Sequence, residues 1–504
     1  MATPGELLAK SLEIMRTVQK EGIIRSSDLP RVHRERLLKA GFLQEIIKGW
    51  LLAKDPAIRE KDSTPWYASF WSFARRYLDE RFGDQYCLSQ EASIKIYTGS
   101  TVVPKQLVVI TKSKGTQLLQ LPFGTSLFMY QDKKNFPEGR VNRDGLWIMD
   151  LPTALCRLQP ASFKNDSTDI EIALRMVRDV SLLLRILLEG GNSAIAGRLA
   201  GAYRFLGEEK TASRIVKGME AAGYRIRITN PFEKDTPALE SGARIASPYV
   251  SRIEALWKSM RDDVVGVFPQ APGMSKDPER YIRKMEEIYV NDAYNSLSIE
   301  GYEITAGLVE RIRDGQWNPE NEQDKQQRDA LAAKGYSLAF NAVEESIRKI
   351  LAGNNPGEIA DADHHDWYSQ MFSPSVQAGI LKPSDLAGYR DGQVYIKGSK
   401  HVPLPKEAVL DCMEILFRLL KEEQDAGVRA VLGHFVFVFI HPYMDGNGRM
   451  GRFLMNAMLA AGGYPWTVIR LERRKQYMAA LEEASVNGRI SPFAEFISEE
   501  MGAN

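Results

Sequence analysis

The sequence predicts a mainly α-helical protein with short β elements toward its N-terminus. Helical patterns recur along the chain, most clearly at residues 7–20, 170–188 and 406–421. Candidate strands are few and short, the clearest lying at 106–111 and 126–130, and no long alternating pattern accompanies them. These two observations favour helical domains joined to small sheets.

The composition is that of a multidomain globular protein without a global charge signal. The chain has 504 residues, of which 44% are hydrophobic, and a formal net charge of +1. This length predicts two or three domains, and the near-neutral charge gives no reason to expect the whole chain to bind nucleic acid or a membrane surface. The longest apolar run, near Phe437, is too short to span a bilayer. We therefore expect no membrane partner.

The cysteines indicate a reducing compartment. Cys87, Cys156 and Cys412 are odd in number and widely spaced, and they form neither a disulfide framework nor a metal-binding pattern. The first residues lack the basic-then-apolar pattern of a signal peptide. We expect the protein to be cytoplasmic.

Residues 7–54 have the element pattern of a winged helix. Residues 30–40 form a candidate recognition helix, and 42–53 read as a two-stranded wing that turns at Lys48 and Gly49. The block holds ten Lys/Arg and five Asp/Glu, a net charge of +5, as expected where a protein contacts the phosphate backbone. The candidate DNA-binding residues are Arg31, Arg34, Arg36 and Lys48. A basic helix hairpin, or a winged helix that docks proteins, is the alternative.

Residues 55–235 give fewer clear sequence signals of structure or function. They contain an aromatic helix followed by Tyr86, Cys87, Leu88 and Ser89. Together with residues 7–54, this region resembles the AbiEi-type antitoxins, which implies an α/β region without catalytic residues. Prolines and glycines predict a linker at 236–249, so that a third domain would occupy 250–504.

The most informative stretch is residues 441–452, which read HPYMDGNGRMGR. Gly446 and Gly448 lack a Cβ, so the backbone can approach a ligand closely. Consecutive N–H groups at a turn that enters a helix form an anion site. Arg449 and Arg452 are three residues apart and can face one side of that helix, where guanidinium groups suit phosphate oxygens.

Two further residues of this stretch complete a reactive set. Asp445 offers the hard oxygen ligand that Mg²⁺ prefers, usually together with phosphates and water. His441 is a candidate general base, because its ordinary pKa lies near neutral pH. The stretch therefore combines a polyphosphate site with a group that can activate a hydroxyl.

This stretch resembles the signature loop of the Fic family, H-P-F-x-D/E-G-N-G-R-x-x-R, and departs from it only at Tyr443. The resemblance implies an α-helical Fic domain with a β-hairpin flap. It also implies transfer of AMP from ATP, with Mg²⁺, to a Tyr, Thr or Ser hydroxyl of a protein. The implied roles are catalytic for His441, metal-binding for Asp445, and nucleotide-binding for Gly446, Asn447, Gly448, Arg449 and Arg452.

The segment before the loop has conflicting signals. Residues 428–440 are almost wholly apolar and rich in Phe and Val, so propensity alone favours a buried strand. The Fic resemblance implies a buried helix that ends just before His441. Periodicity cannot separate the two in a short run, and we adopt the helix.

Residues 387–405 resemble the Fic flap. Val394, Tyr395 and Ile396 read as a short strand, and Gly398 with Ser399 as its turn. The resemblance implies that this hairpin holds the target segment by strand addition. An ordinary hairpin is the alternative.

Residues 296–301 read SLSIEG and match the Fic inhibitory motif S/T-x-x-x-E-G/N. Ser296 and Glu300 are four residues apart, so both lie on one helix face, and Gly301 should end the helix. The resemblance implies that Glu300 pairs with Arg452 and keeps it from the γ-phosphate of ATP.

We therefore expect an autoinhibited protein adenylyltransferase coupled to DNA binding, with ATP, a hydroxyl-bearing protein and DNA as partners. One group of alternatives uses the same site: transfer of UMP, phosphocholine or phosphate, or removal of AMP with Glu300 orienting a water. Gly448 argues against the phosphate transfer of Doc-like proteins. The other alternative is a non-enzymatic DNA-binding regulator or antitoxin, against which the intact His441 argues. A homodimer remains open.

Overall fold

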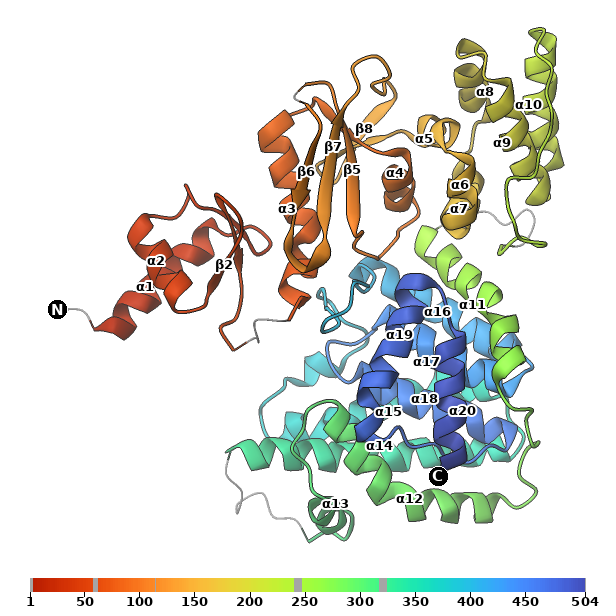
Figure 1. Ribbon diagram of the computed structural model, residues 1–504. Helices are drawn as coiled ribbons and strands as arrows, with labels where there is room; N and C mark the ends of the chain where they lie inside the picture. The colour runs from red at the N-terminus through yellow and green to blue at the C-terminus, as the bar shows by residue number, and fades with distance from the viewer. Residues whose placement is uncertain (1–2, 58–61, 114, 240–246, 317–323, 504) are drawn as a thin grey trace. The chain divides into compact units, whose positions relative to one another are not determined.

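The structure is a computed structural model that describes residues 3–57, 62–113, 115–239, 247–316 and 324–503 (Figure 1). Helices dominate it, as predicted, and none of the described helices is both long and apolar enough to cross a membrane. The chain forms two compact units, one of residues 1–248 with 395–402, the other of residues 249–394 with 403–504. Residues 240–246 of the predicted linker lie outside the described residues.

The first unit begins with two helices and a three-stranded sheet. These elements are α1 (Pro4–Val18), β1 (Ile23–Arg25), α2 (Arg31–Lys39), β2 (Leu43–Ile47) and β3 (Trp50–Ala53). The sheet is antiparallel in the order β1-β3-β2. Thr3 and Glu6 begin α1 by a reciprocal capping box, which satisfies two N–H groups at the helix start. The helices and the paired strands expected in residues 7–54 are present at the expected positions.

A second sheet follows in the first unit. Its elements are α3 (Thr64–Phe82), β4 (Tyr86–Leu88), α4 (Gln90–Tyr97), β5 (Gln106–Thr111), β6 (Gln117–Gln120), β7 (Ser126–Gln131), β8 (Arg140–Arg143) and β9 (Leu146–Met149). The strand order is β4-β5-β7-β6, with β5 and β7 parallel, while β8 and β9 form a separate antiparallel pair. Buried aromatic residues of α3, including Trp66, Phe70 and Phe73, form a core with this sheet. The strands predicted at 106–111 and 126–130 are confirmed.

Six helices complete this unit: α5 (Leu151–Arg157), α6 (Pro160–Asn165), α7 (Ser167–Met176), α8 (Val180–Glu189), α9 (Ser193–Phe205) and α10 (Glu209–Ala221). The prediction of one long helix over 170–188 is wrong, because α7 ends at Met176 and α8 starts at Val180. Between them, the Asp179 carboxylate accepts a hydrogen bond from the N–H of Ser181 at 2.9 Å, which caps a new helix.

The second unit is helical. It contains α11 (Pro248–Val267), α12 (Pro278–Ile299), α13 (Ala306–Arg313), α14 (Asp324–Leu351), α15 (Pro356–Gln377), α16 (Val409–Glu422), α17 (Ala426–Ile440), α18 (Asn447–Gly462), α19 (Arg474–Asn487) and α20 (Ser491–Ala503). Helix α18 packs against α17, α14 and α15 (Figure 1), and nearly all residues of α17 and α18 are buried. The helix expected over 428–440 is confirmed, and the strand favoured by propensity is wrong.

Candidate active site

The 441–452 loop joins the end of α17 to the start of α18. His441 caps α17 in the left-handed region (φ 55°, ψ 62°) and donates its main-chain N–H to the Phe437 oxygen at 3.0 Å. Gly446 precedes α18 with φ 81°, and a Cβ at this position would lie 2.9 Å from the Phe372 ring. Only glycine fits both this backbone conformation and this space. The first N–H groups of α18, which have no partner within the helix, thus point out of a close turn.

The imidazole of His441 is oriented by α17. Its Nδ1 lies 3.0 Å from the Val438 carbonyl oxygen, so Nδ1 carries the proton and Nε2 is the acceptor nitrogen. Burial lowers the pKa of His441, and the nearby positive charge of Arg390 lowers it further. The ring is therefore held neutral at neutral pH, with a basic nitrogen available.

Arg390 fixes the backbone next to His441. Its Nε donates to the His441 oxygen at 2.8 Å, its main-chain N–H donates to the Pro442 oxygen at 2.9 Å, and the side chain is 5% exposed. The sequence placed Arg390 in the flap motif without assigning it a role, because nothing in the motif indicates that it reaches across to residues 441 and 442.

Asp445 and Arg449 face each other across the first turn of α18. Their closest atoms, Asp445 Oδ2 and Arg449 Nη2, are 3.4 Å apart, and the Asp445 side chain is 67% exposed. The Arg449 guanidinium lies 5.3 Å from the centre of the Tyr302 ring and 5.1 Å from that of Phe372. This aromatic cage holds a buried cation in place, and sequence reasoning did not find it.

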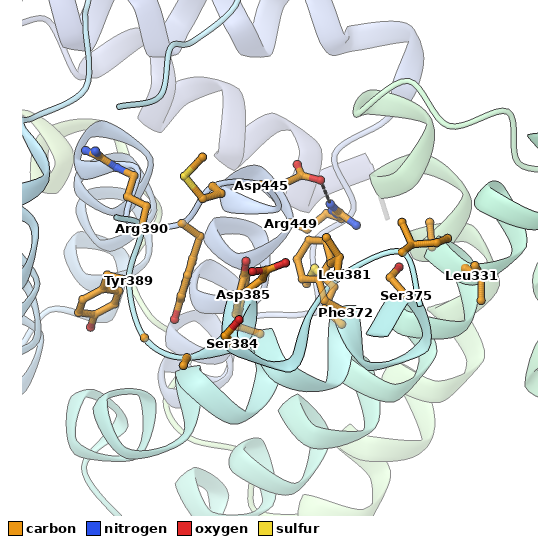
Figure 2. A pocket seen from close by; sticks show the side chains of 18 of the residues that line it. Leu331, Phe372, Ser375, Leu381, Ser384, Asp385, Tyr389, Arg390, Asp445 and Arg449 are labelled. Atoms are coloured by element: carbon orange, nitrogen blue, oxygen red, sulfur yellow. Dashed lines mark hydrogen bonds and ion pairs between the residues drawn. The ribbon is translucent and has the colours of Figure 1, made fainter. Parts of the chain in front are cut away.

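A pocket of about 700 Å³ adjoins the loop, in the size range of small-molecule sites (Figure 2). Asp445 and Arg449 line it together with Tyr368, Phe372 and Tyr443. A ligand that contacts the first turn of α18 can therefore extend into an aromatic-lined hollow.

Asn447 shapes the loop through its side chain. The amide oxygen accepts from the Tyr443 N–H at 2.9 Å, and the amide nitrogen donates to the Tyr443 oxygen at 2.8 Å. The Tyr443 hydroxyl lies 3.1 Å from His365 Nδ1, and its ring stacks on Tyr368 with centroids 3.8 Å apart. This hydroxyl contact gives Tyr443 a partner that the commoner phenylalanine would lack.

The predicted contact between Glu300 and Arg452 forms. Arg452 donates from Nη2 to Glu300 Oε1 at 2.7 Å and from Nε to Ser296 Oγ at 2.9 Å. Helix α12 ends at Ile299 with Glu300 as its cap, and Gly301 follows with φ 91°. Both the shared helix face of Ser296 and Glu300 and the glycine stop are thus confirmed.

The Glu300 carboxylate lies directly over the anion site. A Cβ built on Gly448 would be 2.4 Å from Glu300 Oε1. Burial alone would raise the pKa of Glu300, but the charges of Arg452 and Arg449 outweigh it, so the pKa of this carboxyl is lowered. An anion therefore already occupies the position that the loop prepares for phosphate.

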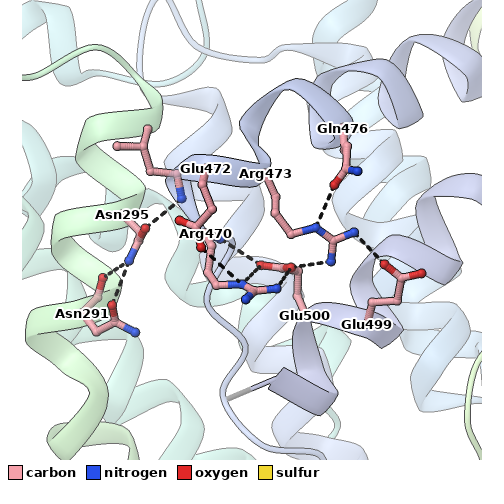
Figure 3. A network of polar contacts seen from close by, with 9 residues as sticks. Asn291, Asn295, Arg470, Glu472, Arg473, Gln476, Glu499 and Glu500 are labelled. Atoms are coloured by element: carbon pink, nitrogen blue, oxygen red, sulfur yellow. Dashed lines mark hydrogen bonds and ion pairs between the residues drawn. The ribbon is translucent and has the colours of Figure 1, made fainter.

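Polar contacts hold the C-terminal end of α12 in place (Figure 3). The Asn295 side-chain oxygen accepts from the Leu471 N–H at 2.8 Å, and Arg474 Nε donates to the Ile299 oxygen at 2.7 Å. The fully buried Glu500 of α20 accepts from both Arg470 and Arg473. Helix α12 is thus bonded to the segment that follows α18, which the sequence did not indicate.

The predicted flap strand at 394–396 does not form. The turn predicted at Gly398 and Ser399 lies one residue earlier, at 397–398, and no strand is assigned to 394–396. Val394 is buried and Tyr395 is 43% exposed. Among the described residues no main-chain segment pairs with 394–396, and a ladder requires such a partner, so the strand prediction is wrong.

The four candidate DNA-binding residues fall into two groups. Arg34 Nη1 donates to the Ser26 oxygen at 2.9 Å, and Arg36 Nη1 donates to the Leu7 oxygen and to Ser11 Oγ at 3.0 and 2.8 Å. Arg31 is 80% exposed and paired with Glu35, while Lys48 is exposed in the β2–β3 turn.

The chain is mainly helical, and one short loop brings together a histidine, a carboxylate and the N-terminus of a helix. Residues 363–459 match the family model described as Fic/DOC family.

The chain is also similar to known Fic proteins. It is 29% identical over 221 residues to the protein adenylyltransferase Fic of Drosophila grimshawi, covering 43% of this chain and 42% of that protein. For the Drosophila ananassae protein of the same name, the identity is 28% and the coverage 43% and 41%. The chain thus spans less than half the length of these relatives. Fic-1 from C. elegans aligns with 67% of this chain and 85% of its own, at 18% identity and a TM-score of 0.37.

Proposed function

We propose that the protein transfers AMP from ATP to a Tyr, Thr or Ser hydroxyl of a protein, itself included, and that Glu300 restrains this activity. The names of the relatives support this proposal. The observation that carries it is a pair of buried guanidinium nitrogens at the first turns of α18, Arg449 Nε and Arg452 Nη1, that have no hydrogen-bond partner among the described residues. Buried donors without partners cost free energy, and a polyphosphate would satisfy both.

The proposed reaction assigns one role to each side chain of the loop. The acceptor hydroxyl oxygen attacks the α-phosphorus of ATP while Nε2 of His441 takes the hydroxyl proton. The bond from the α-phosphorus to the bridging oxygen breaks, and pyrophosphate leaves. The N–H groups of Asn447 and Gly448 bind the α-phosphate, and Arg449 and Arg452 bind the outer phosphates.

The residues present fit Mg²⁺ as the metal. Asp445 is the carboxylate of the loop and is largely exposed, and no group of three or more His, Cys, Asp or Glu arranged to hold a metal occurs among the described residues. Mg²⁺ characteristically binds through one or two carboxylates together with phosphates and water. Bound there, it would neutralise phosphate charge.

Intact-protein mass spectrometry tests the proposal directly. The Glu300→Gly variant is incubated with Mg²⁺ and ATP, CTP, UTP or GTP, and the mass increment identifies the group transferred. AMP addition supports the proposal, and UMP addition would establish the same-site alternative. Loss of AMP from protein that already carries it, faster in the wild type than in Glu300→Gly, would instead assign Glu300 to AMP removal.

The lowered pKa of His441 predicts the pH dependence of transfer. A base with a lowered pKa stays neutral to a more acidic pH than an ordinary histidine, so the rate should hold as the pH falls through 6.5 and decline only below it. Initial rates of ATP labelling in Glu300→Gly between pH 5 and 8, at saturating ATP, check this. A decline centred at or above 6.5 would contradict it.

We also propose that residues 7–54 bind DNA, coupling transfer to a DNA site. The net charge of +5 in this block supports the proposal, and the exposure of Arg31 and Lys48 makes them the side chains available for phosphate. Arg34 and Arg36 are partly engaged by main-chain oxygens and contribute to the fold of the block.

Arg31→Ala with Lys48→Ala should therefore weaken DNA binding and make it less salt-dependent. Each lost phosphate contact reduces the slope of log affinity against log salt by about 1, so the pair should reduce it by about 2. Fluorescence anisotropy with genomic fragments at several salt concentrations measures this. Glu13→Gln serves as the surface control, and binding that is absent or insensitive to salt would favour a protein-docking role.

A further inference from the structure

Residues 395–402, here called the flap segment, belong to the first compact unit although the chain on both sides of them belongs to the second. The N–H of Val103 donates to the Lys400 oxygen at 3.0 Å, and the N–H of Val402 donates to the Thr101 oxygen at 2.9 Å. These two bonds form an antiparallel bridge between Val102 and His401. Residues 101–103, just before β5, therefore act as a short partner strand for the flap segment.

Side chains reinforce this bridge. His401 Nδ1 lies 2.8 Å from Thr101 Oγ1, the Gly398 N–H donates to Thr64 Oγ1 at 2.8 Å, and Lys397 lies 3.8 Å from the Asp62 carboxylate. These contacts reach the flap segment from residues 62–64 as well as from 101–103. They extend from its turn to His401.

The bridge is anchored in a hydrophobic core. His401 and Val103 are each 1% exposed, and Val402 packs against the core cluster that contains Val103 and the aromatic residues of α3. A buried pairing of this kind is more costly to open than a contact between exposed loops.

The start of the flap segment, before its turn, has main-chain groups without partners. Among the described residues, the main-chain N–H groups of Tyr395 and Ile396 have no hydrogen-bond partner, and Tyr395 is 43% exposed. Unpaired main-chain groups of this kind can bond to an added polypeptide strand. The flap segment is thus held by its own chain at 400–402, while its N–H groups at 395–396 are available to another segment.

We propose that residues 101–103 are positioning residues for the transfer reaction: they hold the flap segment along 400–402 so that the unpaired main-chain groups of residues 395–396 receive a hydroxyl-bearing segment of the acceptor protein. This inference rests on the proposed transfer function. It gives residues 101–103 a part in selecting the acceptor, independent of DNA binding.

The pairing itself is tested by a cross-link. The hydrogen bonds flank Val102 and His401 rather than joining them, which makes this a non-hydrogen-bonded pair with closely spaced side chains on one face. Such a pair meets disulfide geometry. Val102→Cys with His401→Cys should therefore cross-link on mild oxidation of the full chain, whereas Val102→Cys with Val402→Cys should not, because Val402 faces the opposite side. The natural cysteines, Cys87, Cys156 and Cys412, are buried and should not compete.

The positioning role is tested by kinetics in a Glu300→Gly background, with full-length His441→Ala protein as the acceptor. Thr101→Val, which removes the contact with His401, should raise the KM for the acceptor by about fivefold, the effect expected of one hydrogen bond. The kcat and the affinity for ATP should stay unchanged. In the Val102→Cys/His401→Cys variant, oxidation should lower the acceptor KM relative to the reduced form of the same protein.

The outcomes separate this inference from the proposed function. Equal cross-linking of the two cysteine pairs would overturn the pairing of Val102 with His401, whatever the activity. A Thr101→Val variant that changes kcat or ATP affinity instead of the acceptor KM would overturn the positioning role. Transfer that stops on oxidation and returns with reductant would also overturn it, since the bridge would then have to open for the acceptor. No transfer by Glu300→Gly to any acceptor would remove the proposed function, and this inference with it, even if the cysteines cross-link.

Discussion

Replacing His441 by alanine should lower the rate of AMP transfer by about 10²–10⁴-fold, the usual contribution of a positioned general base. The Val438 oxygen fixes the proton on Nδ1, so the nitrogen that remains is placed to take a proton from the acceptor. The rate is measured with radiolabelled ATP in the Glu300→Gly background. Binding of ATP should survive the change, because the phosphate contacts come from α18.

The backbone at His441 requires a second variant. Its φ of 55° is in the left-handed region, where alanine is strained and asparagine is tolerated. His441→Asn therefore keeps the loop conformation while removing the base, and it should be as inactive as His441→Ala. Labelling by both variants at the rate of the parent would show that transfer does not use this side chain as a base.

The loop could be predicted from sequence because its determinants are local. His441, Asp445, Gly446 and Arg449 lie within nine consecutive positions, and the backbone freedom of glycine with the start of α18 defines most of their geometry. The Ser296–Glu300 spacing is likewise a property of one helix turn. The ion pair between Glu300 and Arg452 joins residues far apart in the sequence, and only the family resemblance indicated it.

The features that residue patterns alone do not predict depend on tertiary contacts. Propensity favours a strand for residues 428–440, yet Asp425 caps Val428 and the run forms α17, because packing on every side overrides the preference of Phe and Val. The predicted strand at 394–396 lacks a partner and does not form. Arg390 and the Tyr302–Phe372 cage act across many residues and leave no pattern in the sequence.

Removing the Glu300 carboxylate should release the activity that it restrains. An inhibitory coupling of about 1–3 kcal/mol corresponds to about 5–150-fold in the affected equilibrium, so Glu300→Gly should label itself that much more strongly than the wild type. Arg452 should remain in place without Glu300, because Ser296 accepts from its Nε and, through the main-chain oxygen, from its Nη2 at 3.0 Å. Glu286→Gly is the matched control, since it removes an exposed carboxylate from the same helix.

The double variant decides how Glu300 acts. If its carboxylate excludes phosphate by occupying Arg452 and the space over Gly448, then Glu300→Gly with Arg452→Ala should lose the gained activity, because the freed cation is what binds ATP. If the double variant stayed as active as Glu300→Gly, the gain would come from an emptied Gly448 site alone. Equal labelling by wild type and Glu300→Gly would contradict restraint altogether. Since Glu300 bonds to Arg452 and also covers the phosphate site, we expect ATP affinity to rise in Glu300→Gly and to fall below the wild-type value in the double variant, as calorimetric titration would measure.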